Sequence, residues 1–337
     1  MVADPATPRV PMGDERFVFN IVWTGDTFTH LQVFTASVLA HCGARLRFVG
    51  NQCPPSQLDA MARFAEAHPG RVVEVFDLGT TRMVRHGDAL DTVRARRDDG
   101  EFFCLLDPDI LARGPFLDRF AALADDHEGV TSGKEVWIES NVRPDGHPGV
   151  NGEVFFDRDG YVFGSPHFAI YRRAALDAAV ERWGVGFSSS GDADFAPGVR
   201  ARLEELGRGY WIYDTGKVVN ILMQGDGCRF VHEESPDLVH IGGVSHFLAP
   251  PMTPEGEAPV WGENVRDWHR WDGMEVRYAA AEFVAEVIEA TFAGRPVPAI
   301  PAPVPDAIRA RLERLVADVA GVARRFGPGH PGYAAPG

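Results

Sequence analysis

Two acidic residues stand directly after an apolar run in the first half of the chain. Residues 102–106 are apolar throughout, which predicts a buried strand, and Asp107 and Asp109 follow it. Residues two apart in an extended chain point to the same side, so both carboxylates are expected together at the end of this strand. Two such anions repel unless a cation lies between them, and carboxylate oxygens suit Mg²⁺ or Mn²⁺. The pair therefore predicts a divalent-metal site, although Asp-Pro-Asp is also typical of a solvated turn.

Further groups that could do chemistry follow in the second half. Asp192 and Asp194 stand just before a predicted helix, where a carboxylate either caps the helix or serves catalysis. His240 and His246 flank a Gly-Gly turn, and an imidazole there can complete a metal shell or contact a phosphate. A histidine in a turn is also commonly a polar loop residue. The order of the three features along the chain is what indicates a site.

The elements that must position these residues alternate between two periodicities. Short apolar runs rich in β-forming residues alternate with segments of helical spacing over roughly 100 residues. The predicted strands are 17–23, 44–50, 71–77 and 102–107, and the predicted helices are 27–41, 56–68 and 86–97. This alternation predicts an α/β fold with a mostly parallel sheet and helices on both faces. Such sheets bind ligands beyond the carboxyl ends of their strands.

The rest of the chain is less regular. A strand is expected at 210–213, and helices at 194–207, 275–292 and 307–326. The last helix is amphipathic, so it could pack on its own chain or on a second subunit in a homodimer. We expect five parts: a flexible leader (1–14), an α/β half (15–130), a second half of the same domain (131–250), a connector with C-terminal helices (251–326) and a flexible tail (327–337).

Composition excludes several classes of function. The chain has 33 basic and 48 acidic residues among 337, a formal net charge of −15, which disfavours binding to nucleic acids and to anionic membranes. No apolar run is long enough to span a bilayer, and residues 1–16 do not read as a secretory signal. The four cysteines are scattered, as expected of reduced thiols in a cytoplasmic protein. The common dinucleotide, P-loop, zincin and α/β-hydrolase motifs are all missing.

Taken in order, the motifs resemble those of the GT-A glycosyltransferases, most of all the glycosyltransferase family 2-like branch. The resemblance covers roughly residues 17 to 248. The segments that carry it are 86–90 with 102–109, 164–173, 191–195 followed by Arg200 and Gly207, and 240–245. The chain departs from the family pattern in two places. Gly191 stands where an acid is usual, and the second strand ends in Asn51 without an acidic pair.

The resemblance implies a GT-A fold with a C-terminal helical extension and a hexosyl-type transferase. The donor would be a nucleotide-diphosphate sugar, the acceptor a hydroxyl of a small molecule or glycan, and the cofactor Mn²⁺ or Mg²⁺. Asp107 and Asp109 would hold the metal, joined by His240. Asp192 matches the general base of inverting members, with Asp194 as second choice. The residues expected to contact the donor are Thr24, Asn51, Asp77, Asp88, Gly164, Ser165 and His167.

Other functions would also fit these motifs. A nucleotidyltransferase also places paired acids on an α/β sheet, but it normally has a basic loop after its first strand, and residues 24–28 contain no basic side chain. A binding module without turnover, or a retaining transferase, would fit the same motifs. Trp137 and Trp211 could face a sugar, although core packing is the more common role for tryptophan.

Overall fold

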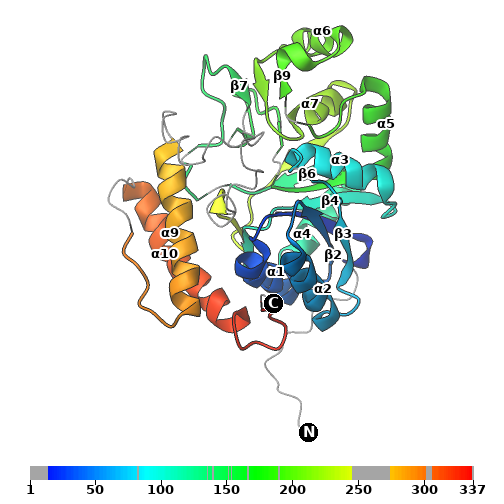
Figure 1. Ribbon diagram of the computed structural model, residues 1–337. Coiled ribbons are helices and arrows are strands. Elements are labelled where there is room, and N and C mark those ends of the chain that lie inside the picture. The colour runs from blue at the N-terminus through cyan, green and yellow to red at the C-terminus, as the bar shows by residue number, and fades with distance from the viewer. Residues whose placement is uncertain are drawn as a thin grey trace.

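A seven-stranded sheet forms the centre of the computed structural model (Figure 1). The structure describes residues 14–81, 83–134, 136–138, 140–150, 152, 154–164, 167–188, 190–244, 274–300 and 306–335. In spatial order the strands are β11 (Phe230–His232), β6 (Gly129–Ser132), β8 (Phe168–Arg172), β4 (Phe102–Leu106), β1 (Val18–Thr24), β2 (Arg45–Asn51) and β3 (Val72–Asp77). Only β8 among these strands runs antiparallel to its neighbours. The predicted mostly parallel α/β fold is confirmed.

Helices cover both faces of this sheet. One face packs against α1 (Phe28–His41), α2 (Pro55–Ala67) and α4 (Leu117–Asp126), and the other against α3 (His86–Arg96), α5 (Arg173–Trp183) and α7 (Lys217–Gly225). Side chains alternate between the faces along each strand. In β4, Phe102 and Cys104 belong to the first core and Phe103 and Leu105 to the second. This two-sided burial explains why β4 is apolar at every position.

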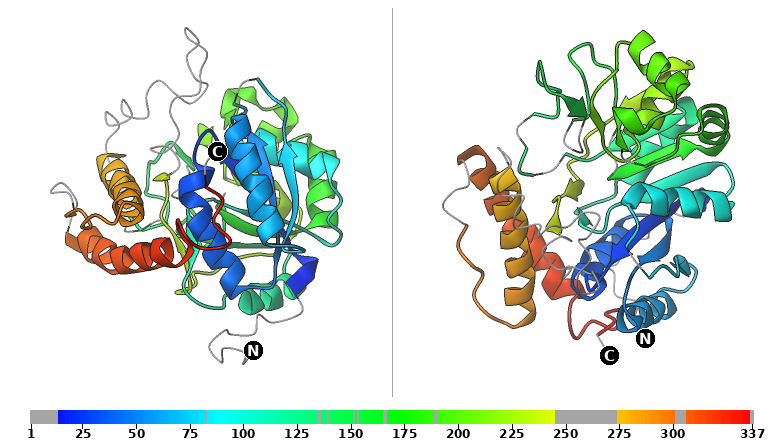
Figure 2. Two further views of the ribbon diagram at one scale, coloured as in Figure 1. Left: turned by 60° about the horizontal axis from the view of Figure 1, so that its bottom comes forward. Right: turned by 45° about the horizontal axis from the view of Figure 1, so that its top comes forward.

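Two long helices close the described part of the chain. α9 (Met274–Phe292) and α10 (Asp306–Phe326) lie side by side along one flank of the sheet (Figures 1 and 2). Leu312, Leu315 and Val319 repeat at helical spacing on α10, and all three are buried in the same core as α1. The amphipathic C-terminal helix thus packs on its own chain.

The residues after α10 run back to α1. Tyr333 donates its hydroxyl hydrogen to the carbonyl oxygen of Thr29, at 2.9 Å. The Gln32 side chain exchanges two hydrogen bonds with the backbone of Ala334, at 2.8 and 2.9 Å. The described part of the tail is therefore anchored, where the sequence suggested a flexible end.

Two small sheets carry the remaining site residues. β12 (Leu238–His240) pairs with β5 (Ile110–Ala112), just after β4. β7 (Gly149–Val150), β10 (Ile212–Tyr213) and β9 (Ser190–Gly191) form the other small sheet, followed by a 3-10 turn (Asp192–Asp194) and α6 (Pro197–Glu205). The expected strand at 210–213 and helix at 194–207 both exist, but each is shorter than predicted.

The described residues contain neither a membrane-spanning helix nor a disulfide bond. None of their helices is both long and apolar enough to cross a membrane. Their four cysteines are all free thiols.

Candidate functional site

Asp107 lies at the carboxyl end of β4, opposite a histidine. β4 pairs antiparallel with β8, and Leu106 stands beside Phe168, so His167 comes directly before β8 at the same edge. The backbone N–H of Asp107 donates to the carbonyl of His167 at 2.7 Å. Asp107 Oδ2 lies 2.9 Å from Nδ1 of His167. The sheet register therefore places both side chains together.

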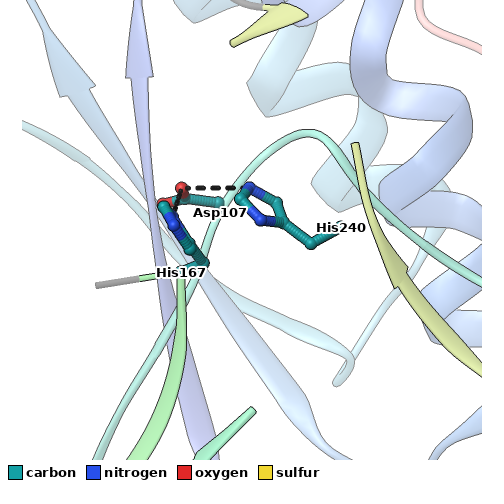
Figure 3. Close-up of side chains that lie close together, drawn as sticks. All are labelled: Asp107, His167 and His240. Atoms are coloured by element: carbon teal, nitrogen blue, oxygen red, sulfur yellow. Dashed lines mark hydrogen bonds and ion pairs between the residues drawn. The ribbon is translucent and has the colours of Figure 1, made fainter. Parts of the chain in front are cut away.

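A second histidine reaches the same point from β12. His240 is the register partner of Ile110, which brings its ring beside the acidic pair. Its Nε2 lies 3.3 Å from Oδ1 of Asp109 and 3.7 Å from Oδ2 of Asp107. The rings of His167 and His240 lie 3.8 Å apart, centre to centre. Figure 3 shows both rings directed at the Asp107 carboxylate.

These side chains form a set of candidate metal ligands. One oxygen of Asp107 and one nitrogen each from His167 and His240 lie within 4.8 Å of one another. Two members, Asp107 and His240, were predicted as metal ligands, whereas His167 was predicted to contact the donor. The Asp109 carboxylate is buried, pairs with His240 and accepts the Val244 N–H at 3.1 Å. Asp109 and Asp107 both lie near Nε2 of His240, so Asp109 adds negative charge directly beside the candidate ligands.

The two carboxylates have opposite electrostatic environments. Burial raises the pKa of Asp107 to about 6, with the charge of Asp109 adding to the rise and His86 opposing it. Burial also acts to raise the pKa of Asp109, but the neighbouring His240 outweighs it and the pKa falls to about 2. Burial lowers the pKa of His167 well below its usual range. His167 is therefore a neutral imidazole at pH 7, the form that binds a metal ion.

Asp214 lies next to this group and was missed in the sequence. It follows β10 directly, and its backbone N–H donates to Val150 at 3.0 Å. A Cβ atom on Gly152 would lie 2.9 Å from Oδ2 of Asp214 and 3.7 Å from Cε1 of His167, so carboxylate and imidazole share one small space. Its negative charge also raises the pKa of Asp107. An acid after a predicted strand was the signal that identified Asp107, and it applied equally to residue 214.

The predicted catalytic acids lie at the other end of β10. The N–H of Asp192 donates to the carbonyl of Trp211 at 3.0 Å. Trp211 and Asp214 are three positions apart, which is about 10 Å along the strand at ~3.3 Å per residue, and Asp192 lies beside Trp211 on the neighbouring strand. Asp194 is exposed, and its carboxylate accepts the Gly191 N–H at 3.1 Å, as a local turn cap does. Trp211 is 71% exposed, so its expected core role is wrong, whereas Trp137 is buried.

Four residues predicted to contact the donor lie near the ends of β1, β2 and β3 and at the start of α3. Asn51 exchanges two hydrogen bonds with the backbone of Val84, at 2.9 and 3.0 Å. Asp77 accepts the Gly79 N–H at 3.0 Å. Asp88 accepts the Ser188 hydroxyl, and the Thr24 carbonyl accepts the Thr27 hydroxyl at 2.8 Å. Three side chains thus shape the loops at this edge, and Thr24 does so through its backbone.

Gly164 is bound through its backbone carbonyl by a buried lysine. Lys217 is fully buried, and its ammonium donates to the carbonyls of Gly164 and Val154, the latter at 2.7 Å. Gly164 has φ +72°, and a Cβ atom there would lie 2.4 Å from Nδ2 of Asn220. Two of the predicted residues, Ser165 and His246, lie outside the described part of the chain.

We expect Gly164→Ala to lower the free energy of unfolding by about 2–4 kcal/mol, because a strained left-handed backbone and a blocked Cβ act together. Gly160→Ala is the matched control, since Gly160 has φ +79° with no atom within 4 Å of its Cβ position. That variant should lose only about 1–2 kcal/mol. Urea unfolding of both measures the difference, and equal losses would show that the Asn220 contact does not matter.

Comparison with solved structures finds sugar transferases. The mannosyltransferase PcManGT from Pyrobaculum calidifontis, in complex with GDP-Man and Mn²⁺, is 16% identical over 94% of this chain and 76% of its own, with a TM-score of 0.37. The galactosyltransferase LgtC, in complex with donor and acceptor sugar analogues, is 14% identical over 78% and 95%, with a TM-score of 0.38. The glycosyltransferase GlyE of Streptococcus pneumoniae is 9% identical over 83% and 65%, with a TM-score of 0.37.

All three are glycosyltransferases, as the sequence resemblance predicted. No protein-family model and no curated protein sequence matches the chain. At these identities and TM-scores the likeness carries no argument about activity, which must come from the geometry of the site itself.

Proposed function

We propose that this protein is a metal-dependent glycosyltransferase, which moves a hexosyl group from a nucleotide-diphosphate sugar to a hydroxyl of a small molecule or glycan. The observation that carries the proposal is the group formed by Asp107, His167 and His240 at the carboxyl end of β4. Ligands of mostly parallel sheets bind beyond this edge. A buried carboxylate beside two imidazoles suits an ion that has further positions open to a diphosphate.

The ligand set fits Mn²⁺ better than Mg²⁺. Mg²⁺ prefers oxygen ligands and keeps several waters, whereas imidazole nitrogen suits the transition metals. His167 supplies a neutral ring, and Nε2 of His240 lies 3.3 Å from Asp109 and 3.7 Å from Asp107, so both carboxylates face the nitrogen that would bind the ion. A bound ion would supply Lewis-acid neutralisation of the departing diphosphate.

The remaining steps belong to the chain's own side chains. In an inverting transfer, the acceptor hydroxyl loses its proton to a carboxylate on the face of the sugar opposite the diphosphate. Asp192 is our candidate for this base, because residues 191–195 resemble the family segment that carries it, and because it lies beside Trp211, about 10 Å along β10 from Asp214. Trp211, exposed beside Asp192, offers an apolar face for a sugar ring.

We infer that the donor nucleotide would bind along the neighbouring strand ends. Thr24, Asn51 and Asp77 end β1, β2 and β3, and Asp88 stands in the first turn of α3. Asn51 holds the loop at Val84 through two hydrogen bonds, which gives this edge a fixed shape before any ligand binds. A preformed edge suits the base and ribose of a nucleotide, because less order must be gained on binding.

The proposal is tested by a melting-temperature screen of nucleoside diphosphates with and without Mn²⁺. A ligand that binds only the native state raises stability, so a nucleotide that acts only together with Mn²⁺ identifies the donor class. The metal must displace the Asp107 proton, whose pKa is about 6, so the Mn²⁺-dependent shift should shrink as the pH falls below 6. No shift with any nucleotide in the presence of Mn²⁺ at pH 7.5 would overturn the proposal.

A further inference from the structure

A hollow of about 290 Å³ lies between β12 and α10. Its walls come from the loop after β6, from β12 and from α10, whose relation to the central sheet is visible in Figure 2. The lining contains four basic residues, Arg113, Lys134, Arg311 and Arg314, against one acidic residue, Glu234. A formal excess of three positive charges is unusual on a chain with a net charge of −15. The hollow therefore favours an anionic ligand.

The basic side chains differ in what holds them. Arg113 pairs with Asp318 at 2.5 Å, and Arg311 donates to the backbone carbonyls of Val136 and Ile138. Within the described part of the chain, no ion pair is formed by Lys134 or Arg314. Once the Arg113 pair is discounted, the excess is two positive charges. A phosphate monoester carries about −1.5 to −2 at pH 7, which matches this excess.

The hollow is separated from the metal-ligand group by a single residue. Gly133 lines it, and a Cβ atom on Gly133 would lie 3.6 Å from Cβ of His240 and 3.8 Å from Cβ of His167. Leu238 and Val239 of β12 also line it, and His240 is the next residue of that strand. An anion held here would thus lie against the residue that packs beside the Cβ atoms of His240 and His167.

We propose that this hollow binds the phosphate group of a soluble, phosphorylated acceptor. The inference rests on the proposed function, because it assigns the acceptor of that transfer. Arginine presents a planar pair of N–H donors that matches phosphate oxygens, and lysine adds a point charge. The volume lies near the lower end of small-molecule pockets and suits a single small group. The net charge of −15 disfavours contact with an anionic lipid surface, so a free phosphate ester is the expected ligand.

The test is a calorimetric titration of the full chain with inorganic phosphate in the presence of a chelator, which removes metal-bound phosphate from the signal. Arg314→Gln should weaken phosphate binding at least tenfold, because a charge-assisted donor is lost. Lys134→Gln should weaken it in the same direction. The matched control is Arg324→Gln, an exposed arginine in the last turn of α10 outside the hollow, which should bind as the unmodified protein does. Equal phosphate affinity in Arg314→Gln and in the unmodified protein would overturn the inference.

Two further arms separate the sources of failure. Vesicles that contain phosphatidylglycerol replace phosphate in the first arm, and Arg314-dependent binding to vesicles alone would assign the site to a lipid headgroup and overturn a soluble acceptor. Nucleotide binding with Mn²⁺ is measured in the second arm. If nucleotide binds but Arg314→Gln leaves the phosphate affinity unchanged, only the acceptor assignment fails. If Arg314→Gln weakens phosphate binding but no nucleotide binds, the transferase proposal fails. The hollow would then still bind phosphate, but not as an acceptor site.

Discussion

Replacing Asp107 by asparagine is expected to abolish the binding of Mn²⁺ and with it all metal-dependent turnover of a nucleotide sugar. The amide keeps the shape of the side chain but removes the charged oxygen that lies 2.9 Å from His167 and 3.7 Å from His240. A buried carboxylate whose pKa is raised to about 6 is unfavourable in the metal-free fold at pH 7. Its loss should therefore stabilise the metal-free protein by about 1–3 kcal/mol. Calorimetry with Mn²⁺ and thermal unfolding without it measure the two effects.

Two companion variants sharpen this test. Asp118→Asn makes the same change at an exposed position in the first turn of α4, and it should leave Mn²⁺ affinity and stability unaltered. Asp109→Asn should weaken Mn²⁺ binding by about 10–100-fold without abolishing it, because a negative charge 3.3 Å from Nε2 of His240 is lost while the three candidate ligands remain. Normal Mn²⁺ affinity in Asp107→Asn would remove the metal assignment. Complete loss in Asp109→Asn, with a normal fold, would make Asp109 a direct ligand, as the sequence suggested.

The second large effect is expected at Asp192. Asp192→Asn should lower kcat by about 10²–10⁴-fold, because the acceptor hydroxyl loses the carboxylate that takes its proton. Donor affinity should stay within about twofold, since the base acts on the opposite face of the sugar from the diphosphate. Steady-state kinetics and donor titration by calorimetry separate the two quantities.

Asp214→Asn is the informative comparison for the base. Asp214 shares a small space with His167, so its loss should weaken donor binding or metal binding in addition to any effect on rate. Asp194→Asn should have little effect on rate, because that exposed carboxylate caps its own turn. The base would be reassigned to Asp214 under two conditions. Asp214→Asn would have to lower kcat with donor affinity intact, and Asp192→Asn would have to leave kcat unchanged.

Local pattern was sufficient for four strands of the central sheet and for the position of Asp107. The alternation of strand and helix periodicity predicted β1 to β4 and α1 to α3 close to their observed bounds, because each element buries a regular apolar face. The uninterrupted apolar run of β4 also predicted its central, two-sided burial, and with it the place of Asp107. These features depend on residues a few positions apart, and periodicity records such relations directly.

Which residues meet in the site depends on contacts between segments that are far apart in the sequence. His167 joins Asp107 only because β8 runs antiparallel beside β4, and His240 arrives through the pairing of β12 with β5. Asp214 reaches the same group at the end of β10, and the basic hollow needs α10 packed near β12. Strand register and helix packing are set by the burial of whole faces, which no local motif contains. The sequence by itself thus determined the fold class and the place of Asp107 at the end of β4, while only the tertiary structure decided which histidines Asp107 meets, that Asp214 lies beside them, and where the positive charge gathers.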